Sequence, residues 1–194
     1  MLEPVQLIEQ IKIAFADVKK VDKTLEQCFI TDKWGIGGLS EDEFGKIYHE
    51  ASKNRPYHNW TEIPKEQLEK YDLPFCNMSN EEFAFFLPAY MVYVVEWYLK
   101  NPKTDWWENK FLVGLARHLG YDHDYESFIY KYSSMNDLQK STILDYACFI
   151  VDLTYKTVDK KDFFENERKK NLHEYHLESV LKAKNKLLSF RIYD

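Results

Sequence analysis

Apolar and polar positions follow one another along the chain with the spacing of amphipathic helices. Leu7, Ile11, Phe15 and Val18 recur at helical intervals between charged residues, which predicts a first helix from Pro4 to Val18. Proline suits the first turn of such a helix. No alternating strand pattern of convincing length and no internal repeat is found. The pattern therefore predicts an all-α fold, with at most one short hairpin of strands.

The most apolar segment lies over residues 83–99. Its apolar side chains form one broad helical stripe, and further aromatic residues lie on the opposite side. Such a helix belongs at the centre of a domain, and Pro88 should kink it or split it into two pieces. The segment is too short for a transmembrane helix and also contains Glu96 and several tyrosine and tryptophan rings with polar tips.

Three pairs of polar residues have the spacing of a capping box, in which an N-cap side chain and a residue three positions later bond each other's backbone amides. They predict a helix ending near Ser52, the central apolar helix, and a second core helix ending near Val158. The pairs are Ser40 with Glu43, Ser79 with Glu82, and Asn136 with Gln139.

The remaining segments give weaker signals. Ile63-Pro64 begins a short helical turn, and Asn101-Pro102 ends the central helix. A further helix is expected to begin at Asp105 and to end at Gly120, whereas residues 121–134 have no clear pattern. After Lys160 the charge density rises and leucines mark a long amphipathic helix. We therefore expect a helical domain over residues 1–158 and a C-terminal helical extension over residues 159–194, packed on this domain or on a second subunit.

The composition predicts a large hydrophobic core and a location in a reducing compartment. Hydrophobic residues make up 45% of the 194 residues and aromatic residues 16%, so aromatic burial can supply much of the stability. Cys28, Cys76 and Cys148 are dispersed and odd in number, which argues for buried thiols rather than disulfides or a zinc knuckle. The N-terminal residues have no secretory pattern, so the expected location is the cytoplasm.

The net charge of −6 arises entirely in the first half of the chain. Residues 1–100 carry 11 basic and 17 acidic side chains, whereas residues 101–194 carry 15 of each. An acidic surface repels nucleic acid and anionic membranes and favours a basic protein partner. The candidate binding residues are Glu41, Asp42 and Glu43, which are adjacent at one helix start. The alternatives are ordinary solubilising charge and a favourable interaction with the helix dipole.

Two patterns resemble ligand sites, but neither has the required details. Residues 35–38 read Gly-Ile-Gly-Gly before a helix, as in a phosphate-binding loop. However, no Lys-Ser or Lys-Thr follows, and the acidic residues 41–43 would repel phosphate, so a plain glycine turn is expected. His173 and His176 are three residues apart, whereas the metalloprotease motif needs a spacing of four.

Other polar residues are candidates for metal binding or for acid–base chemistry. A second group, His118, Asp122, His123 and Asp124, is equally unspecific, so no metal and no cofactor are expected. Acid–base chemistry would require that Glu96, Asp145 and Asp152 are buried, because burial raises the pKa of a carboxyl group. Asp145 and Asp152 are seven residues apart and share a helix face, as they would also do in a solvated stripe.

Two stretches carry a family resemblance, Trp60-Thr61-Glu62-Ile63-Pro64 and Phe83-Ala84-Phe85-Phe86-Leu87-Pro88-Ala89-Tyr90-Met91. They resemble a family of uncharacterised bacterial proteins, a domain of unknown function, with a Phe-x-x-Tyr-Leu-Pro-Ala-Tyr-Met-like box in which Phe86 replaces the usual tyrosine. The similarity extends to a leading helix and to Leu138-Gln139-Lys140 with the following apolar helix, about half of the chain, and the basic extension after Val158 departs from it. The resemblance implies no activity and no catalytic residues.

Three functions remain as hypotheses. The leading one is a non-catalytic binding protein, an immunity-like or regulatory factor that masks a basic partner, because a compact acidic helical domain with many aromatic residues suits that role. The second is an enzyme with a site assembled from dispersed carboxylates and histidines. The third is a structural homodimer formed through the C-terminal helix.

Overall fold

The fold is all-α, as predicted. The computed structural model describes residues 2–35, 37–54, 56–71, 75, 77–102 and 130–158, together with residues 178, 181, 182, 185 and 188. Throughout these residues the regular elements are helices. The helix expected between Asp105 and Gly120 and most of the C-terminal extension lie outside them. Leu181, from that extension, is half-buried against the core.

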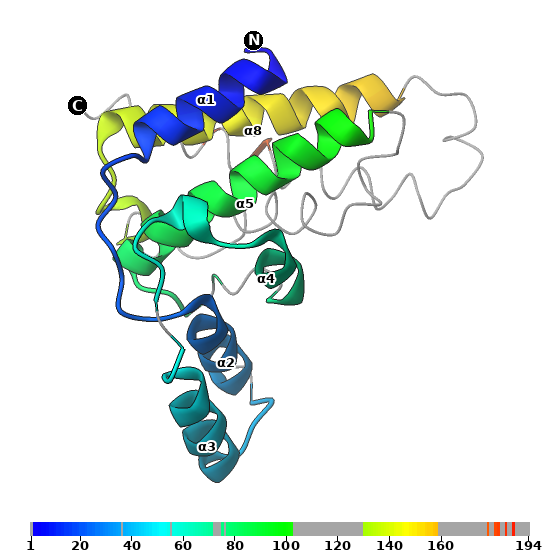
Figure 1. Ribbon diagram of the computed structural model, residues 1–194. Helices are drawn as coiled ribbons and strands as arrows, with labels where there is room; N and C mark the ends of the chain where they lie inside the picture. Colours follow the sequence, from blue (N-terminus) through cyan, green and yellow to red (C-terminus); the bar gives the residue numbers. More distant parts are fainter. Residues whose placement is uncertain are drawn as a thin grey trace.

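Three long helices lie side by side in one layer (Figure 1). They are α1 (Pro4–Ala14), α5 (Asn80–Lys100) and α8 (Asp137–Val158), and α1 contacts both of the others. Helix α1 ends at Ala14 rather than Val18, because the chain turns there toward the next element. Helix α5 is continuous through Pro88, so the predicted split does not occur, and a kink at Pro88 stays a prediction.

Helix α5 forms the buried centre, as its apolar pattern predicted. Twelve of its residues are buried, and aromatic rings surround it. The Phe75 ring meets both Phe83 and Tyr90 edge to face, at centroid distances of 5.3 and 5.2 Å. This geometry is favourable because the positive edge of one ring meets the negative face of another.

The three predicted capping boxes are confirmed. Ser40 and Glu43 begin α3 (Glu41–Ala51), and Ser79 and Glu82 begin α5. At α8 the backbone amide of Asn136 donates to Gln139 Oε1 at 3.0 Å, and the amide of Gln139 donates to Asn136 Oδ1 at 2.9 Å. Each box satisfies two backbone amides that the helix itself leaves without a partner.

A short segment packs against one side of α5. It consists of a 3-10 turn, η1 (Trp60–Glu62), and helix α4 (Lys65–Lys70), the second of which the Ile63-Pro64 pair predicted. Trp60 Nε1 donates to the carbonyl of Phe15 at 2.9 Å and so ties this segment to the residues after α1. The hydroxyl of Tyr90 on α5 donates to the carbonyl of Tyr71, which immediately follows α4. Both bonds are buried.

Helix α2 (Leu25–Gly35) was not predicted, and it explains the glycine run that follows it. The Gly37 amide donates to Trp34 O and the Gly38 amide to Lys33 O, both at 2.9 Å. Gly37 has a φ of 76°, which favours glycine. These features form a Schellman motif, the usual glycine end of a helix. The expected plain glycine turn is therefore confirmed, with its role now assigned.

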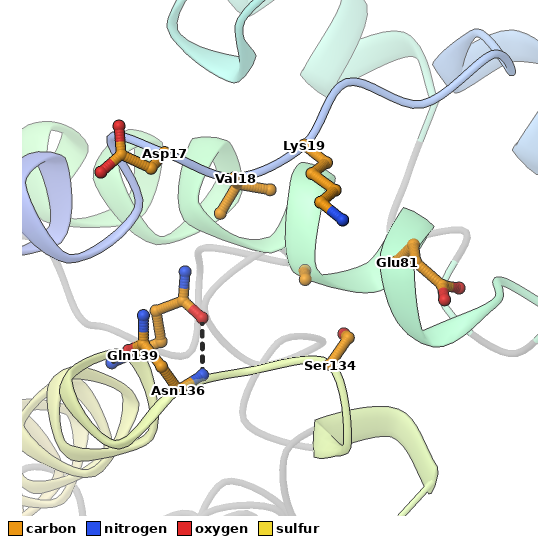
Figure 2. A pocket seen from close by; sticks show the side chains of 8 residues that line it. Asp17, Val18, Lys19, Glu81, Ser134, Asn136 and Gln139 are labelled. Atoms are coloured by element: carbon orange, nitrogen blue, oxygen red, sulfur yellow. Dashed lines mark hydrogen bonds between the residues drawn. The ribbon is translucent and has the colours of Figure 1, made fainter.

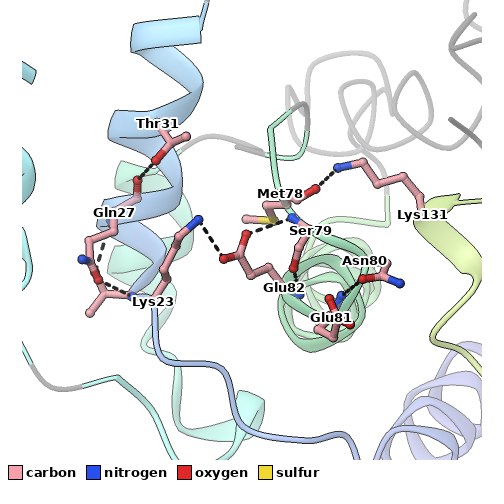
Figure 3. Close-up of polar contacts among 10 residues, drawn as sticks. Lys23, Gln27, Thr31, Met78, Ser79, Asn80, Glu81, Glu82 and Lys131 are labelled. Carbon is pink, nitrogen blue, oxygen red and sulfur yellow. Dashed lines mark hydrogen bonds and ion pairs between the residues drawn. The ribbon is translucent and has the colours of Figure 1, made fainter. Parts of the chain in front are cut away.

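Helices α2 and α3 form a pair below the three-helix layer (Figure 1). We call residues 25–51 the α2–α3 hairpin. Near its start, Lys23 Nζ lies 2.9 Å from Glu82 Oε1 on α5, as Figure 3 shows. Near the end of α2, Asp32 Oδ1 accepts the backbone amide of Asn77 at 2.8 Å. Polar contacts thus join α2 to the residues around the start of α5.

No helix in the described part of the chain combines the length and the apolar character that crossing a membrane requires.

Candidate functional site

The three candidate binding residues lie together in the first turn of α3, and all three are exposed. Glu43 belongs to the capping box, where its Oε2 accepts the Ser40 hydroxyl at 2.6 Å and the Ser40 amide at 3.0 Å. These hydrogen bonds lower the pKa of Glu43. Glu41 and Asp42 have no side-chain partner among the described residues. The cluster thus contains one carboxylate with a local structural role and two that are available to another molecule.

An aromatic cluster lies between the two helices of the hairpin, outside the hydrophobic core. Trp34 near the end of α2 stacks on Phe44 of α3 at a centroid distance of 4.9 Å and an angle of 29°. Phe44 in turn contacts Tyr48, one helical turn later, at 5.2 Å. Trp34 is 46% exposed and the neighbouring Ile47 is 40% exposed. We call these four residues the hairpin aromatic patch.

The hairpin aromatic patch is exposed because, among the described elements, α3 packs mainly on α2. Ala51 is the sole buried residue within α3. Helix α2 instead buries Leu25, Gln27, Cys28 and Ile30. One face of α2 therefore meets the core while α3 covers another, and α3 itself keeps most of its surface in solvent.

Sequence reasoning located the acidic turn but missed the hairpin aromatic patch. Phe44, Ile47, Tyr48 and Ala51 follow the i, i+3, i+4, i+7 spacing of one helix face, so a signal for an apolar face on α3 was present. The sequence could not show that this face is left half-open, because that depends on α2, which was not predicted. The acidic turn lies on the same short helix as Phe44, Ile47 and Tyr48 of the patch.

A second candidate site is an open pocket of about 390 Å³ between the long helices (Figure 2). The segment after α1 contributes Asp17, Val18 and Lys19, and the first turns of α5 contribute Glu81 and Ala84. The turn that leads into α8, and its first turn, supply the rest of the wall, which comprises Ser134, Asn136 and Gln139. The lining therefore combines charged, amide and apolar groups from three separate parts of the chain.

The carboxylates considered for acid–base chemistry have separate structural partners. Glu96 on α5 forms an ion pair with Lys65 of α4. Asp145 on α8 accepts a hydrogen bond of 2.7 Å from Gln10 Nε2 on α1. These contacts join neighbouring helices, and neither carboxylate lines the pocket. Asp152 lies two turns further along α8 and is half-buried.

Candidate metal ligands fall mainly outside the described residues, which include none of His118, His123, His173 and His176. Within the described ranges no group of three or more histidine, cysteine or acidic side chains could hold a metal ion.

The cysteines that the structure describes behave as core thiols. Cys28 is buried and Cys148 is half-buried, and neither forms a disulfide. Burial raises the pKa of Cys28 to about 12, which keeps it protonated and unreactive as a nucleophile. Burial also disfavours the charge of the adjacent Lys23, but the hydrogen bond and charge of Glu82 outweigh this effect and raise the Lys23 pKa. These groups are structural.

Comparison with known proteins gives a family and no function. A family model described as a family of unknown function, DUF6714, matches residues 3–180. The match continues past Val158, so the departure expected there is not found before residue 180. Neither a curated protein nor a solved structure matches the chain.

Proposed function

The chain belongs to DUF6714, a family of unknown function. From the surface of the chain itself, we propose that it is a non-catalytic protein that binds a basic partner through the α2–α3 hairpin. Its role would be that of a regulatory or immunity-like factor that masks the partner. The hairpin aromatic patch is the observation that carries this proposal.

Exposed stacked rings are unusual outside a core and suit the centre of an interface. Aromatic residues are enriched in the buried centres of protein interfaces because they offer a large contact area at a low cost in side-chain entropy. Trp34 and Ile47 are the exposed members of the patch, and Phe44 and Tyr48 support them. A partner that covers Trp34 would gain apolar contact without any rearrangement of the hydrophobic core.

The charge of the hairpin indicates which kind of partner it would bind. The hairpin carries six acidic and two basic side chains, so most of the net charge of the chain lies on it. Charges around an apolar contact mainly accelerate the encounter of two proteins, and they do so less as salt increases. A partner with lysine or arginine around an apolar depression would match both the acidic turn and the patch.

The test compares two hairpin variants with the parent protein. The charge variant is Glu41→Ser, Asp42→Asn and Glu43→Gln, which keeps a capping side chain at position 43. The patch variant is Trp34→Ala with Ile47→Ser. Immobilised parent protein identifies the partner from a lysate of the native organism, and surface plasmon resonance at two salt concentrations then measures the rates for each variant.

We expect the charge variant to slow association and to weaken its salt dependence, and the patch variant to speed dissociation. A matched charge control is Glu9→Gln, Glu66→Gln and Asp137→Asn, which removes three exposed carboxylates elsewhere. A matched apolar control is Val5→Ser with Ile13→Ser, two exposed residues on α1. If both hairpin variants bind the partner with the parent's rates, the proposal is wrong.

The finer expectations from the sequence remain part of this proposal. We infer a cytoplasmic location because the dispersed thiols fit a reducing compartment. We also propose that the Phe83 to Met91 box is a shared feature of the bacterial family members. An enzyme with a site of dispersed carboxylates and histidines, and a homodimer through the C-terminal helix, are the alternatives. Analytical ultracentrifugation of the full chain separates a homodimer from a monomer that binds another protein.

A further inference from the structure

We infer that the α2–α3 hairpin recognises arginine, with the guanidinium group of the partner protein stacked on the open face of Trp34 and paired with the carboxylate of Glu41. This inference rests on the proposed function, because it names the side chain of the basic partner that contacts the hairpin aromatic patch. Three features carry it: the arrangement of the rings, the position of the carboxylate and the placement of the nearby lysines.

The ring of Trp34 is covered on one face and open on the other. Phe44 stacks on it at a centroid distance of 4.9 Å and an angle of 29°, which occupies one face of the indole. Trp34 is nevertheless 46% exposed. A flat group can therefore lie on the opposite face without displacing Phe44. Tryptophan has the most favourable aromatic face for a cation, which binds within about 6 Å of the ring centroid.

A carboxylate lies on the same side of α3 as the stacked rings. Successive residues of an α-helix are about 100° apart, so Glu41 lies about 60° around α3 from Phe44 and one turn before it. Asp42 lies about 160° from Phe44 by the same geometry. Both carboxylates are exposed and have no side-chain partner among the described residues. Glu41 can therefore accept two parallel hydrogen bonds from a guanidinium group at the rings, whereas Asp42 cannot.

The two lysines of the hairpin leave this position to a cation from another molecule. Lys33 is adjacent to Trp34, but its Nζ lies 4.7 Å from the ring centroid of Phe29. Lys46 lies about 200° around α3 from Phe44, on the opposite side of the helix. Neither lysine therefore covers the indole or neutralises the carboxylate beside it. The contact of Lys33 also shows that a cation and a ring associate on this hairpin.

The flat shape of the rings favours arginine over lysine. A guanidinium group is planar and weakly hydrated, so it can lie parallel to the indole while its edge donates to a carboxylate. The ammonium group of lysine is a compact and strongly hydrated charge, and it has no flat face to stack. The acidic hairpin attracts both cations alike. A preference for arginine therefore reports the stacked contact separately from net charge.

Three variants test the contact. Glu41→Gln and Asp42→Asn form a matched pair, because each removes one exposed carboxylate from the first turn of α3. The two changes have the same effect on net charge and a similar effect on the helix dipole, but only the first removes the carboxylate beside the rings. Trp34→Leu removes the indole and keeps an apolar side chain. Circular dichroism confirms that each variant is folded.

The probes are three peptides in which glycine alternates with arginine, lysine or citrulline, with the same number of each. The first two carry equal charge, whereas citrulline keeps a planar side-chain group without charge. NMR titration of the full chain follows the assigned indole N–H signals. We expect the arginine peptide to shift the Trp34 signal and to bind about threefold more tightly than the lysine peptide, as for an exposed cation–π contact. The signal of Trp60, which is 4% exposed, should not move.

The variants should separate stacking from charge. Glu41→Gln and Trp34→Leu should each remove the preference for arginine, whereas Asp42→Asn should weaken both charged peptides equally and keep the preference. The inference is wrong if the parent protein binds none of the peptides at millimolar concentration, or binds the lysine or citrulline peptide as tightly as the arginine peptide. It is also wrong if Glu41→Gln and Asp42→Asn have equal effects. The proposed function would survive each of these results, because a partner could still present lysine and apolar side chains to the hairpin, and it is tested separately by the binding rates of the hairpin variants.

Discussion

Tyr90→Phe tests whether the hydrogen bond between α5 and the residue that follows α4 stabilises the core. In the parent protein the Tyr90 hydroxyl donates to the carbonyl of Tyr71, and the bond is buried. Phenylalanine keeps the ring and its edge-to-face contact with Phe75 but leaves the Tyr71 carbonyl without this donor. A buried acceptor that loses its partner costs about 1–3 kcal/mol, so the free energy of unfolding should fall by that amount.

The matched control is Tyr93→Phe on the same helix. The Tyr93 hydroxyl donates to Glu69 Oε1 at 2.8 Å, but this bond is exposed. Water can replace the lost partner there, so the change should cost about 0.5 kcal/mol or less. Urea unfolding followed by circular dichroism measures both variants, and an unchanged m-value shows that only stability has changed. Equal losses in the two variants would refute the argument that burial of the Tyr71 carbonyl sets the cost.

Three further predictions concern stability. Gly37→Ala should lower the free energy of unfolding by about 1–2 kcal/mol, because alanine is strained at a φ of 76°. Gly45→Ala, within α3, should raise it by about 0.5–1 kcal/mol, because an added Cβ meets no other atom within 4 Å there. Changes of the same sign in thermal melts would contradict this pair. Burial raises the Cys28 pKa from 9.0 to about 12, so the unfolded chain loses the thiol proton first and the stability due to this group falls by about 1.4 kcal/mol per pH unit across that interval. Cys28→Ala should therefore show a shallower loss of stability between these pH values, and an unchanged slope would count against a buried thiol. Chelator treatment should leave the melting temperature unchanged, and stoichiometric zinc whose removal lowers the melting temperature of untagged protein would overturn this expectation.

The long helices could be predicted because their signals are local. Capping boxes depend on residues three positions apart, so the starts of α3, α5 and α8 were placed correctly from the sequence. The apolar residues on nearly all sides of α5 predicted that this helix lies at the centre of the fold. Both kinds of signal lie within one helix and need no knowledge of its neighbours.

Helix α2 was missed because its buried side is irregular. Its buried residues include the polar Gln27 beside Leu25 and Cys28, so no clean apolar stripe appears. A local signal was nevertheless present, since Thr24 and Gln27 form another capping box of the same kind.

The candidate sites were less accessible to sequence reasoning. The pocket joins residues near positions 17, 81 and 136, and no local pattern reports that these segments meet. Gln139 was assigned correctly to its capping box, but its place in the wall of the pocket becomes apparent only when the surrounding segments are in place. The acidic turn was visible because its three residues are adjacent in the chain.

The single buried residue of α3 has a consequence for how this protein can change over evolutionary time. Substitutions at solvent-facing positions usually alter stability by less than about 0.5 kcal/mol, whereas changes in a packed core often exceed the small margin by which proteins remain folded. Apart from the buried Ala51 and the half-buried Phe44 and Tyr48, the residues of α3 belong to the first group. Its outer surface can therefore diverge between descendants, and acquire new recognition properties, while the three-helix layer retains the same fold.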